Sequence, residues 1–168
     1  YLGDRGRGGT QEPPRVNQSI HAVAAPKAVG SYPHARRVGN TLYLSGIGPR
    51  NPADNSIPGN DYFADGRVRR YDIEAQARAV FANVRAVLEA SGARWEDLVD
   101  VTVYLTDMSR DFKACNAIWA EHFPDAATAP CRTTLGITAL PTPIAIELKC
   151  IALVPSLLPL AGEGAEGG

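Results

Sequence analysis

The chain has 168 residues, of which 45% are hydrophobic and 21% are charged, which is typical of one globular domain with its own apolar core. A net charge of −1 and a pI near 6.3 indicate neither a nucleic acid nor an anionic membrane surface as partner, and no apolar stretch approaches the roughly 20 residues that span a bilayer. Three cysteines without a short-spaced pair and three scattered histidines argue against a disulfide framework and a zinc site, so we expect a cytoplasmic protein without a metal.

Both ends of the chain lack hydrophobic periodicity. Residues 1–18 are rich in Gly, Pro and charge, and residues 156–168 end in a low-complexity run of Gly, Ala and Glu. The Arg-Gly pattern near the start is a weak footprint for RNA, because Asp4 and Glu12 stand beside its arginines. We therefore predict flexible extensions at 1–18 and 156–168 around one domain at 19–155.

The first part of the domain predicts strands and a long loop. A first strand is expected at 19–23, and two further strands at 35–38 and 41–45 flank Gly39-Asn40, a two-residue hairpin signal. A polar segment rich in Gly and Pro follows at 46–70. Loops of this length inside a compact domain are usually functional or mobile.

Two helices and one strand are predicted in the middle of the chain. The first helix has about 20 residues, with Asp72 as N-cap and Gly92 just past its end, and its apolar residues recur at 3.6 spacing: Ile73, Ala77, Val80, Phe81, Val84, Val87 and Leu88. Alternation predicts a strand at 99–106. Ser109 is expected to cap a second helix at 111–123, which has one apolar side.

Two strands are predicted to close the domain, and both alternate. The last strand has one wholly apolar face: Ile144, Ile146, Leu148, Cys150, Ala152 and Val154. Glu147 and Lys149 point the other way. In the strand before it, Cys131 belongs to the apolar side and Arg132 and Thr134 to the other side.

If these two strands pair as an antiparallel hairpin through Leu140-Pro-Thr-Pro143, Arg132 and Thr134 share a face with Glu147 and Lys149. One interpretation is a solvated charged face, in which such pairs contribute only about 0.2–1 kcal/mol. The other interpretation is a binding site, and the pattern by itself leaves both open.

The order of elements predicts an α+β fold, with two helices on one face of a mixed six-stranded sheet. The opposite face carries Ala145, Ile151 and Leu153 and is left open. A partly apolar face of this kind usually meets a partner chain. At such an interface Arg132 and Glu147 become partly buried, where a retained polar cluster favours binding.

Several short motifs share an order and spacing across residues 19–155: Ala28-Val-Gly-Ser-Tyr-Pro-His-Ala35, Leu42-Tyr-Leu-Ser-Gly46, Gln76 and Asn83 in the first helix, Asn116 in the second, Pro130-Cys-Arg-Thr-Thr134, and Ile146-Glu-Leu-Lys-Cys-Ile-Ala152. Together they resemble the reactive-intermediate deaminase (Rid) family of enamine and imine deaminases. The Tyr-Pro-His sequence, Pro49-Arg50 after the Ser-Gly, and Lys149 after Glu147 look most like the 2-aminomuconate deaminases of aromatic-degradation pathways.

The resemblance implies a chorismate-mutase-like fold, a homotrimer whose sheets form a central barrel, and three clefts between subunits. It also implies that Arg132 holds the carboxylate of a small-molecule substrate with help from the backbone N–H of Thr134. Glu147 would position or activate water, and Tyr32 would line the cleft from a neighbouring chain. Substrate-binding roles are expected in addition for Asn116, Ser45 and Arg50. For Arg50 the alternative is a solvated loop arginine among Asn51, Asp54 and Asn55.

The chain departs from the common family pattern at Ser31-Tyr32-Pro33-His34, where Pro-Tyr-Ser-Gln is usual, and at Thr134, where many members have cysteine. These departures favour a specialised substrate. The hypothesis is hydrolytic deamination of 2-aminomuconate or a close unsaturated amino acid, with no cofactor. Alternatives are a general 2-imino or 2-enamino acid deaminase, and a non-catalytic chaperone-like or RNA-interacting member. Deleting residues 1–18 would separate an interaction role of the extension from chemistry in a cleft.

Overall fold

The computed structural model describes residues 17–155 of the chain. Of the predicted extensions, only residues 17 and 18 lie within this part, and they already belong to the first strand. In chain order the elements are β1 (Asn17–Ile20), β2 (Ala35–Val38), β3 (Thr41–Leu44), β4 (Asp61–Tyr62), β5 (Val68–Arg70), α1 (Ile73–Ala90), a 3-10 turn (Trp95–Asp97), β6 (Leu98–Leu105), α2 (Met108–His122), β7 (Cys131–Gly136) and β8 (Ile146–Leu153).

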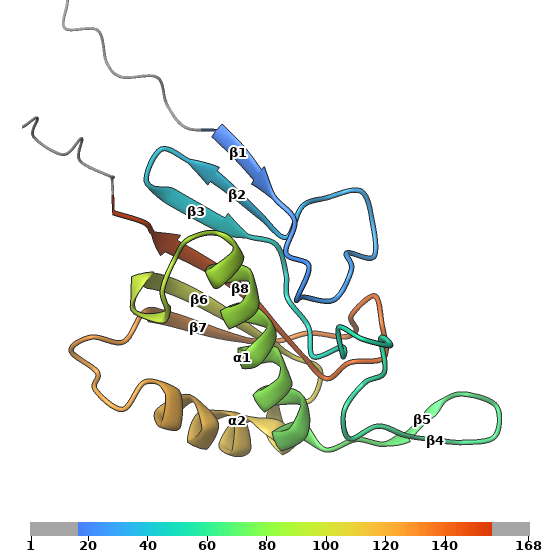
Figure 1. Cartoon of the computed structure of the whole chain (residues 1–168). Helices are drawn as coiled ribbons and strands as arrows, with labels where there is room; N and C mark the ends of the chain where they lie inside the picture. Colours follow the sequence, from blue (N-terminus) through green and yellow to red (C-terminus); the bar gives the residue numbers. More distant parts are fainter. Residues whose placement is uncertain (1–16, 156–168) are drawn as a thin grey trace, which may run out of the picture.

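Six strands form one mixed sheet in the order β1-β2-β3-β8-β6-β7, and every neighbouring pair is antiparallel except β6 and β7. Both helices lie on the same side of this sheet (Figure 1). The predicted α+β architecture, with two helices on one face of a mixed six-stranded sheet, is therefore confirmed. Within residues 17–155, neither helix is long and apolar enough to cross a membrane.

The hairpin predicted around Gly39-Asn40 is confirmed, with Val38 opposite Thr41 and Ala35 opposite Leu44. Gly39 has a φ of 60°, in the left-handed region that such a tight turn requires. The first strand lies earlier than predicted, since β1 ends at Ile20.

The predicted pairing of the last two strands is wrong. β6 lies between β7 and β8, parallel to β7 and antiparallel to β8. The reason is that β6, α2 and β7 form a crossover unit, in which a helix returns the chain so that the second strand runs parallel to the first. The residues between β7 and β8 then carry the chain past β6 to the central position.

The helix ends follow the predicted capping chemistry at α1 and differ at α2. Asp72 Oδ1 accepts hydrogen bonds from the backbone N–H groups of Glu74 and Ala75, at 2.9 and 3.1 Å. At α2 the N-cap is Asp107, which accepts from the Arg110 N–H at 3.1 Å, and not Ser109. Aspartate is at least as good an N-cap as serine, and Ser109 Oγ donates to the same carboxylate.

The segment predicted as a loop at 46–70 contains a small hairpin of β4 and β5, which projects away from the sheet (Figure 1). The base of the hairpin is fixed by Asn60, whose side-chain N–H group donates to the Pro143 carbonyl at 2.8 Å. The Gln76 amide links the same place to the sheet, since Nε2 donates to Asn60 Oδ1 at 2.7 Å and Oε1 accepts from the Ala145 N–H at 2.8 Å.

The core lies between the helices and one face of the sheet. The predicted apolar face of β8 is buried there, and it packs with Val101, Val103 and Leu105 of β6 and with α1. Cys131 is exposed, contrary to the prediction, because β7 turns Arg132 and Thr134 toward the helices instead. The other sheet face is open and partly apolar, and Tyr43, Leu135 and Leu153 on it are 44%, 44% and 50% exposed.

Candidate active site

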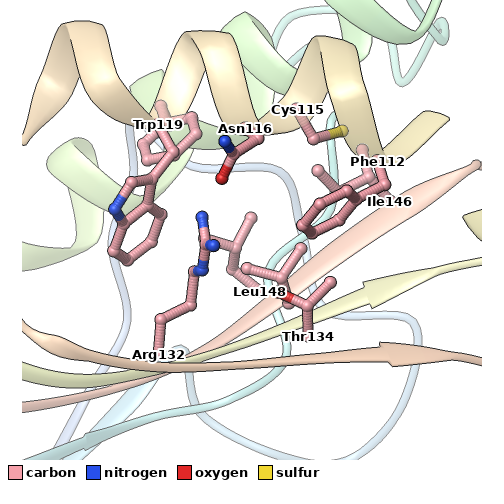
Figure 2. Close-up of a pocket in the computed structure, with 10 residues that line it drawn as sticks. Phe112, Cys115, Asn116, Trp119, Arg132, Thr134, Ile146 and Leu148 are labelled. Carbon is pink, nitrogen blue, oxygen red and sulfur yellow. The ribbon is translucent and has the colours of Figure 1, made fainter.

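Arg132 lies beneath α2 in a pocket that we call the arginine pocket. Figure 2 shows its side chain extending from β7 toward the helix, beside Trp119 and Asn116. The guanidinium carbon is 4.9 Å from the centroid of the Trp119 ring and 6.0 Å from that of Phe112. A cation this close to aromatic faces is stabilised by their quadrupoles and is held in a defined position.

The walls of the arginine pocket come from both helices and from β6, β7 and β8, with the largest share from α2. Phe112, Asn116 and Trp119 follow each other at helical spacing on α2, so they project together toward the sheet. Thr134 stands two residues after Arg132 on β7 and so lies on the same face. The free volume in a single chain is only about 10 Å³, room for about one water molecule.

Within residues 17–155, the Arg132 guanidinium makes no hydrogen bond and no ion pair. Most other arginines in this range have such a partner, for example Arg78 with Glu121 at 2.7 Å. Since a guanidinium carries five donors in a planar fork, an unpaired one in a walled pocket suits the carboxylate of a ligand.

A second pocket, which we call the glutamate pocket, contains Glu147 and lies on the other side of the sheet. It has a volume of about 110 Å³, and its walls include Tyr32, Gly46, Gly48, Arg50 and Ile144. Gly46 approaches Glu147 closely: a Cβ atom at this position would lie 2.8 Å from Glu147 Cδ and nearer still to Oε1. Only glycine leaves this space to the carboxylate.

Burial raises the pKa of Glu147 above its ordinary value of 4.5. No arginine or lysine of the described chain forms an ion pair with Glu147, so no cation opposes this effect. A carboxyl group whose pKa is displaced toward neutrality can exchange protons with a substrate more readily than an ordinary surface glutamate.

Ser45 lines an adjoining hollow that shares Tyr32, Gly46, Gly48 and Arg50 with the glutamate pocket. Ser45 Oγ donates to the Pro33 carbonyl at 2.6 Å, so this hydroxyl fixes the turn that carries Tyr32. His34 beside them is structural: its Nδ1 accepts from the Ala22 N–H and its Nε2 donates to the Pro26 carbonyl, at 3.0 and 2.7 Å.

Arg50 also lines the glutamate pocket, and its guanidinium donates to two groups that do not line it: Asn55 Oδ1 at 3.0 Å and the Lys27 carbonyl at 2.6 Å. The backbone of this segment is held by buried Asn83 of α1. Its Nδ2 donates to the carbonyls of Gly48 and Arg50, at 2.8 and 2.9 Å.

The predicted single patch of Arg132, Thr134, Glu147 and Lys149 does not exist within one chain. Cross-strand partners share a face, and Arg132 is in register with Val101 and Cys150 on the helix side. Glu147 pairs with Tyr104 on the open side. Lys149 is also on the open side, and its ammonium group donates to the Leu44 carbonyl.

The predicted site residues thus fall into two groups. Arg132, Thr134 and Asn116 lie in the arginine pocket, and Glu147, Tyr32, Arg50 and Ser45 lie in or beside the glutamate pocket. The sequence did not identify Phe112 and Trp119 as site residues, although they share the helix face of Asn116. In the described part of the chain, no group of three or more His, Cys, Asp and Glu side chains is arranged to hold a metal ion.

Comparison with known proteins places this geometry in a family. The family model described as Endoribonuclease L-PSP matches residues 22–154. The chain is 35% identical to a RutC family protein of Synechocystis over 137 residues, covering 82% of this chain and 96% of the relative. It is 32% identical over 139 residues to the 2-iminobutanoate/2-iminopropanoate deaminase of Escherichia coli K12, covering 82% and 98%.

Solved structures agree with these relatives. The crystal structure of RidA from the Antarctic bacterium Psychrobacter sp. PAMC 21119 is 33% identical, with a TM-score of 0.69 over 82% of this chain and 99% of that one. A putative endoribonuclease from Thermotoga maritima is 30% identical, with a TM-score of 0.70 over 83% and 99%. The chain belongs to the L-PSP/RutC family of Rid proteins.

Proposed function

We propose that the protein is a hydrolytic deaminase of 2-imino and 2-enamino carboxylic acids, which releases ammonia without a cofactor. The observation that carries the proposal is the unpaired Arg132 guanidinium in a pocket walled by aromatic side chains. The relative named 2-iminobutanoate/2-iminopropanoate deaminase supports the reaction type.

The chemistry requires a carboxylate anchor, a proton-transferring group and a cleft. An enamine acid tautomerises to the imine, water adds to the carbon of the C=N bond, and ammonia leaves. Arg132 binds the carboxylate through two parallel N–H···O bonds, which fixes the imine carbon relative to the attacking water. Glu147 accepts a proton from that water, and its raised pKa suits the later return of a proton to the leaving nitrogen.

Arg132 and Glu147 act on one substrate only if two chains meet, because they lie on opposite sheet faces within a chain. We propose a homotrimer of chorismate-mutase-like arrangement, with a barrel of three sheets and clefts between subunits. Each cleft would join the arginine pocket of one chain to the glutamate pocket of the next, which also brings Tyr32. The exposed Tyr43, Leu135 and Leu153 on the open face favour burial against other copies.

For the substrate, we propose a dicarboxylate of the 2-aminomuconate type. Arg50 places a second guanidinium in the glutamate pocket, where it can meet the distal carboxylate of a six-carbon acid anchored at Arg132. A monocarboxylic imine does not need this contact.

The test of the reaction is ammonia release from freshly generated 2-iminobutyrate and 2-aminomuconate. Arg132→Ala should lose on the order of 1.5–3 kcal/mol of substrate binding, the range for hydrogen bonds to charged groups. Arg78→Ala is the matched control, because Arg78 is exposed on α1, pairs with Glu121 and lines neither pocket. Full activity in Arg132→Ala would show that Arg132 does not bind the substrate carboxylate and would contradict the proposal.

The test of the shared cleft mixes two variant chains that each have strongly reduced activity. Trimers assembled from equal amounts of Arg132→Ala and Glu147→Gln chains should recover activity in about one quarter of their clefts, those that receive both intact residues. If both residues acted within one chain, no mixture would recover activity.

The test of the dicarboxylate substrate is the ratio of kcat/KM for 2-aminomuconate over 2-iminobutyrate. Arg50→Ala should lower this ratio by about tenfold, equal to about 1.4 kcal/mol of differential transition-state binding. An equal effect on both substrates would mean that Arg50 supports the structure of its loop and does not contact the distal carboxylate.

A further inference from the structure

A groove lies between the base of the β4–β5 hairpin and the start of α2, and its lining shares only Ile144 with the glutamate pocket. Its volume is about 270 Å³. Arg69 and Arg70 enter it from β5, Arg110 from the first turn of α2, and Thr106 from the end of β6. Pro143 and Ile144 form an apolar wall. The groove is thus cationic on one side and hydrocarbon on the other.

The charged side chains that line the groove are all arginines, and no carboxylate side chain lines it. Asp61 is shared by two arginines: Arg69 donates a hydrogen bond to its carboxylate, and Arg70 Nε lies 3.1 Å from Asp61 Oδ2. Asp111 lies 3.6 Å from Arg110 Nε. Asp107 also interacts electrostatically with Arg110. Three carboxylates therefore accompany the three guanidinium groups, but none of these carboxylates lines the groove.

Arg110 is held in place for a ligand. Its guanidinium carbon lies 4.0 Å from the centroid of the Tyr71 ring, and its Nη2 donates to the Tyr71 carbonyl at 2.8 Å. The Tyr71 hydroxyl in turn donates to buried Asp111 at 2.6 Å. This arrangement lowers the entropy that Arg110 loses when it binds an anion.

Arg70 supplies donors that the described chain does not use. Its side chain is 74% exposed, and apart from the ion pair between Nε and Asp61 Oδ2 its guanidinium has no partner within residues 17–155. Donors of this kind bind water until an anion replaces it. Together with Arg110 they define the cationic side of the groove.

We propose that this groove binds the carboxylate of a small organic acid, separately from the site that contains Arg132 and Glu147. The carboxylate contacts Arg70 and Arg110, and the hydrocarbon part of the acid lies on Pro143 and Ile144. The volume accommodates an acid of about six carbons, and carboxylate recognition by guanidinium forks gives the charge selectivity. The inference does not rest on the proposed deaminase activity.

Calorimetric titration of the Arg132→Ala protein tests the site. This variant removes carboxylate binding in the arginine pocket, and the assay measures binding without turnover. The probe is hexanoate, which should bind once per chain. Added Arg70→Ala or Arg110→Ala should each weaken its binding about tenfold. Arg67→Ala is the matched control on the same hairpin, since Arg67 is 77% exposed and pairs with Asp65 at 2.7 Å outside the groove.

The comparison of probes separates the two sides of the groove. Hexanoate should bind at least tenfold more tightly than inorganic phosphate, which lacks the hydrocarbon part, and than 1-hexanol, which lacks the charge. Hexanoate binding that is absent, or that survives both Arg70→Ala and Arg110→Ala, overturns the proposal. Equal binding of hexanoate and phosphate overturns the assignment to an organic acid. Arg70→Ala keeps the test decisive even if Arg110→Ala disturbs the fold, because Arg70 is exposed.

Discussion

Replacing Gly46 by alanine tests the placement of Glu147 without touching its chemistry. The new Cβ would lie 2.8 Å from Glu147 Cδ, whereas two carbon atoms in contact normally lie about 3.5–4.0 Å apart. The carboxylate must therefore move by roughly 1 Å, and a misplacement of this size at a reacting centre can cost about 100-fold in rate. Because a flexible side-chain end is displaced, and Gly46 is not in the left-handed region, the fold should persist.

The assay is kcat/KM for ammonia release, with thermal unfolding measured on the same preparation. We expect a loss of about 100-fold, or about 2.7 kcal/mol of transition-state stabilisation, with little change in Tm. Gly136→Ala is the control, since its Cβ would lie at an ordinary 3.5 Å from Met108 Cβ. Shortening the acid in Gly46→Ala/Glu147→Asp should cost less than the two single effects combined, because it relieves the contact. Wild-type kcat/KM in Gly46→Ala would refute the reasoning.

Three further predictions concern protons and the buried amide. The acidic limb of the kcat/KM profile should lie above pH 4.5 in wild type, because burial raises the pKa of Glu147 and the carboxylate is needed as base, and Glu147→Gln should abolish that limb. Gln76→Leu should lower the free energy of unfolding by about 1–3 kcal/mol in denaturant titrations, because it leaves the Ala145 N–H without its partner; no change would mean that water replaces the amide. Burial raises the pKa of Asp111. The contribution of Asp111 to stability is therefore present below its pKa in the unfolded chain and is lost as the pH rises through its pKa in the folded chain. The Tm of Asp111→Asn relative to wild type should increase above about pH 4, and a difference that does not depend on pH would contradict this.

Local chemistry made most elements predictable from sequence. Gly39-Asn40 specified a hairpin because a two-residue turn needs positive φ. Asp72 marked the start of α1 because its carboxylate satisfies free N–H groups, and the alternation in β8 marked its buried face. These signals act over a few residues, so one sequence contains them completely.

The pairing of β7 depends on information that is not local. Alternation showed that Arg132 and Glu147 each lie on the polar face of their own strand. It did not show that another strand lies between these two strands in the sheet. The helical segment before Cys131 was the available signal, since a strand, a helix and a strand in succession favour parallel pairing. The candidate residues were therefore identified, while their division into two pockets required the strand order.

The central position of β8 governs when the fold can close during synthesis. Chains grow from the N-terminus, and β8 is the last strand of the sheet to be made, yet β3 and β6 meet only through it. The bond from Lys149 to the Leu44 carbonyl spans 105 residues of sequence. Until residues 146–153 emerge, the β1–β3 part and the β6–β7 part stay unjoined, each with an open strand edge that invites aggregation. In a nascent chain, the two edges that β8 finally covers are therefore the sheet edges that stay open longest.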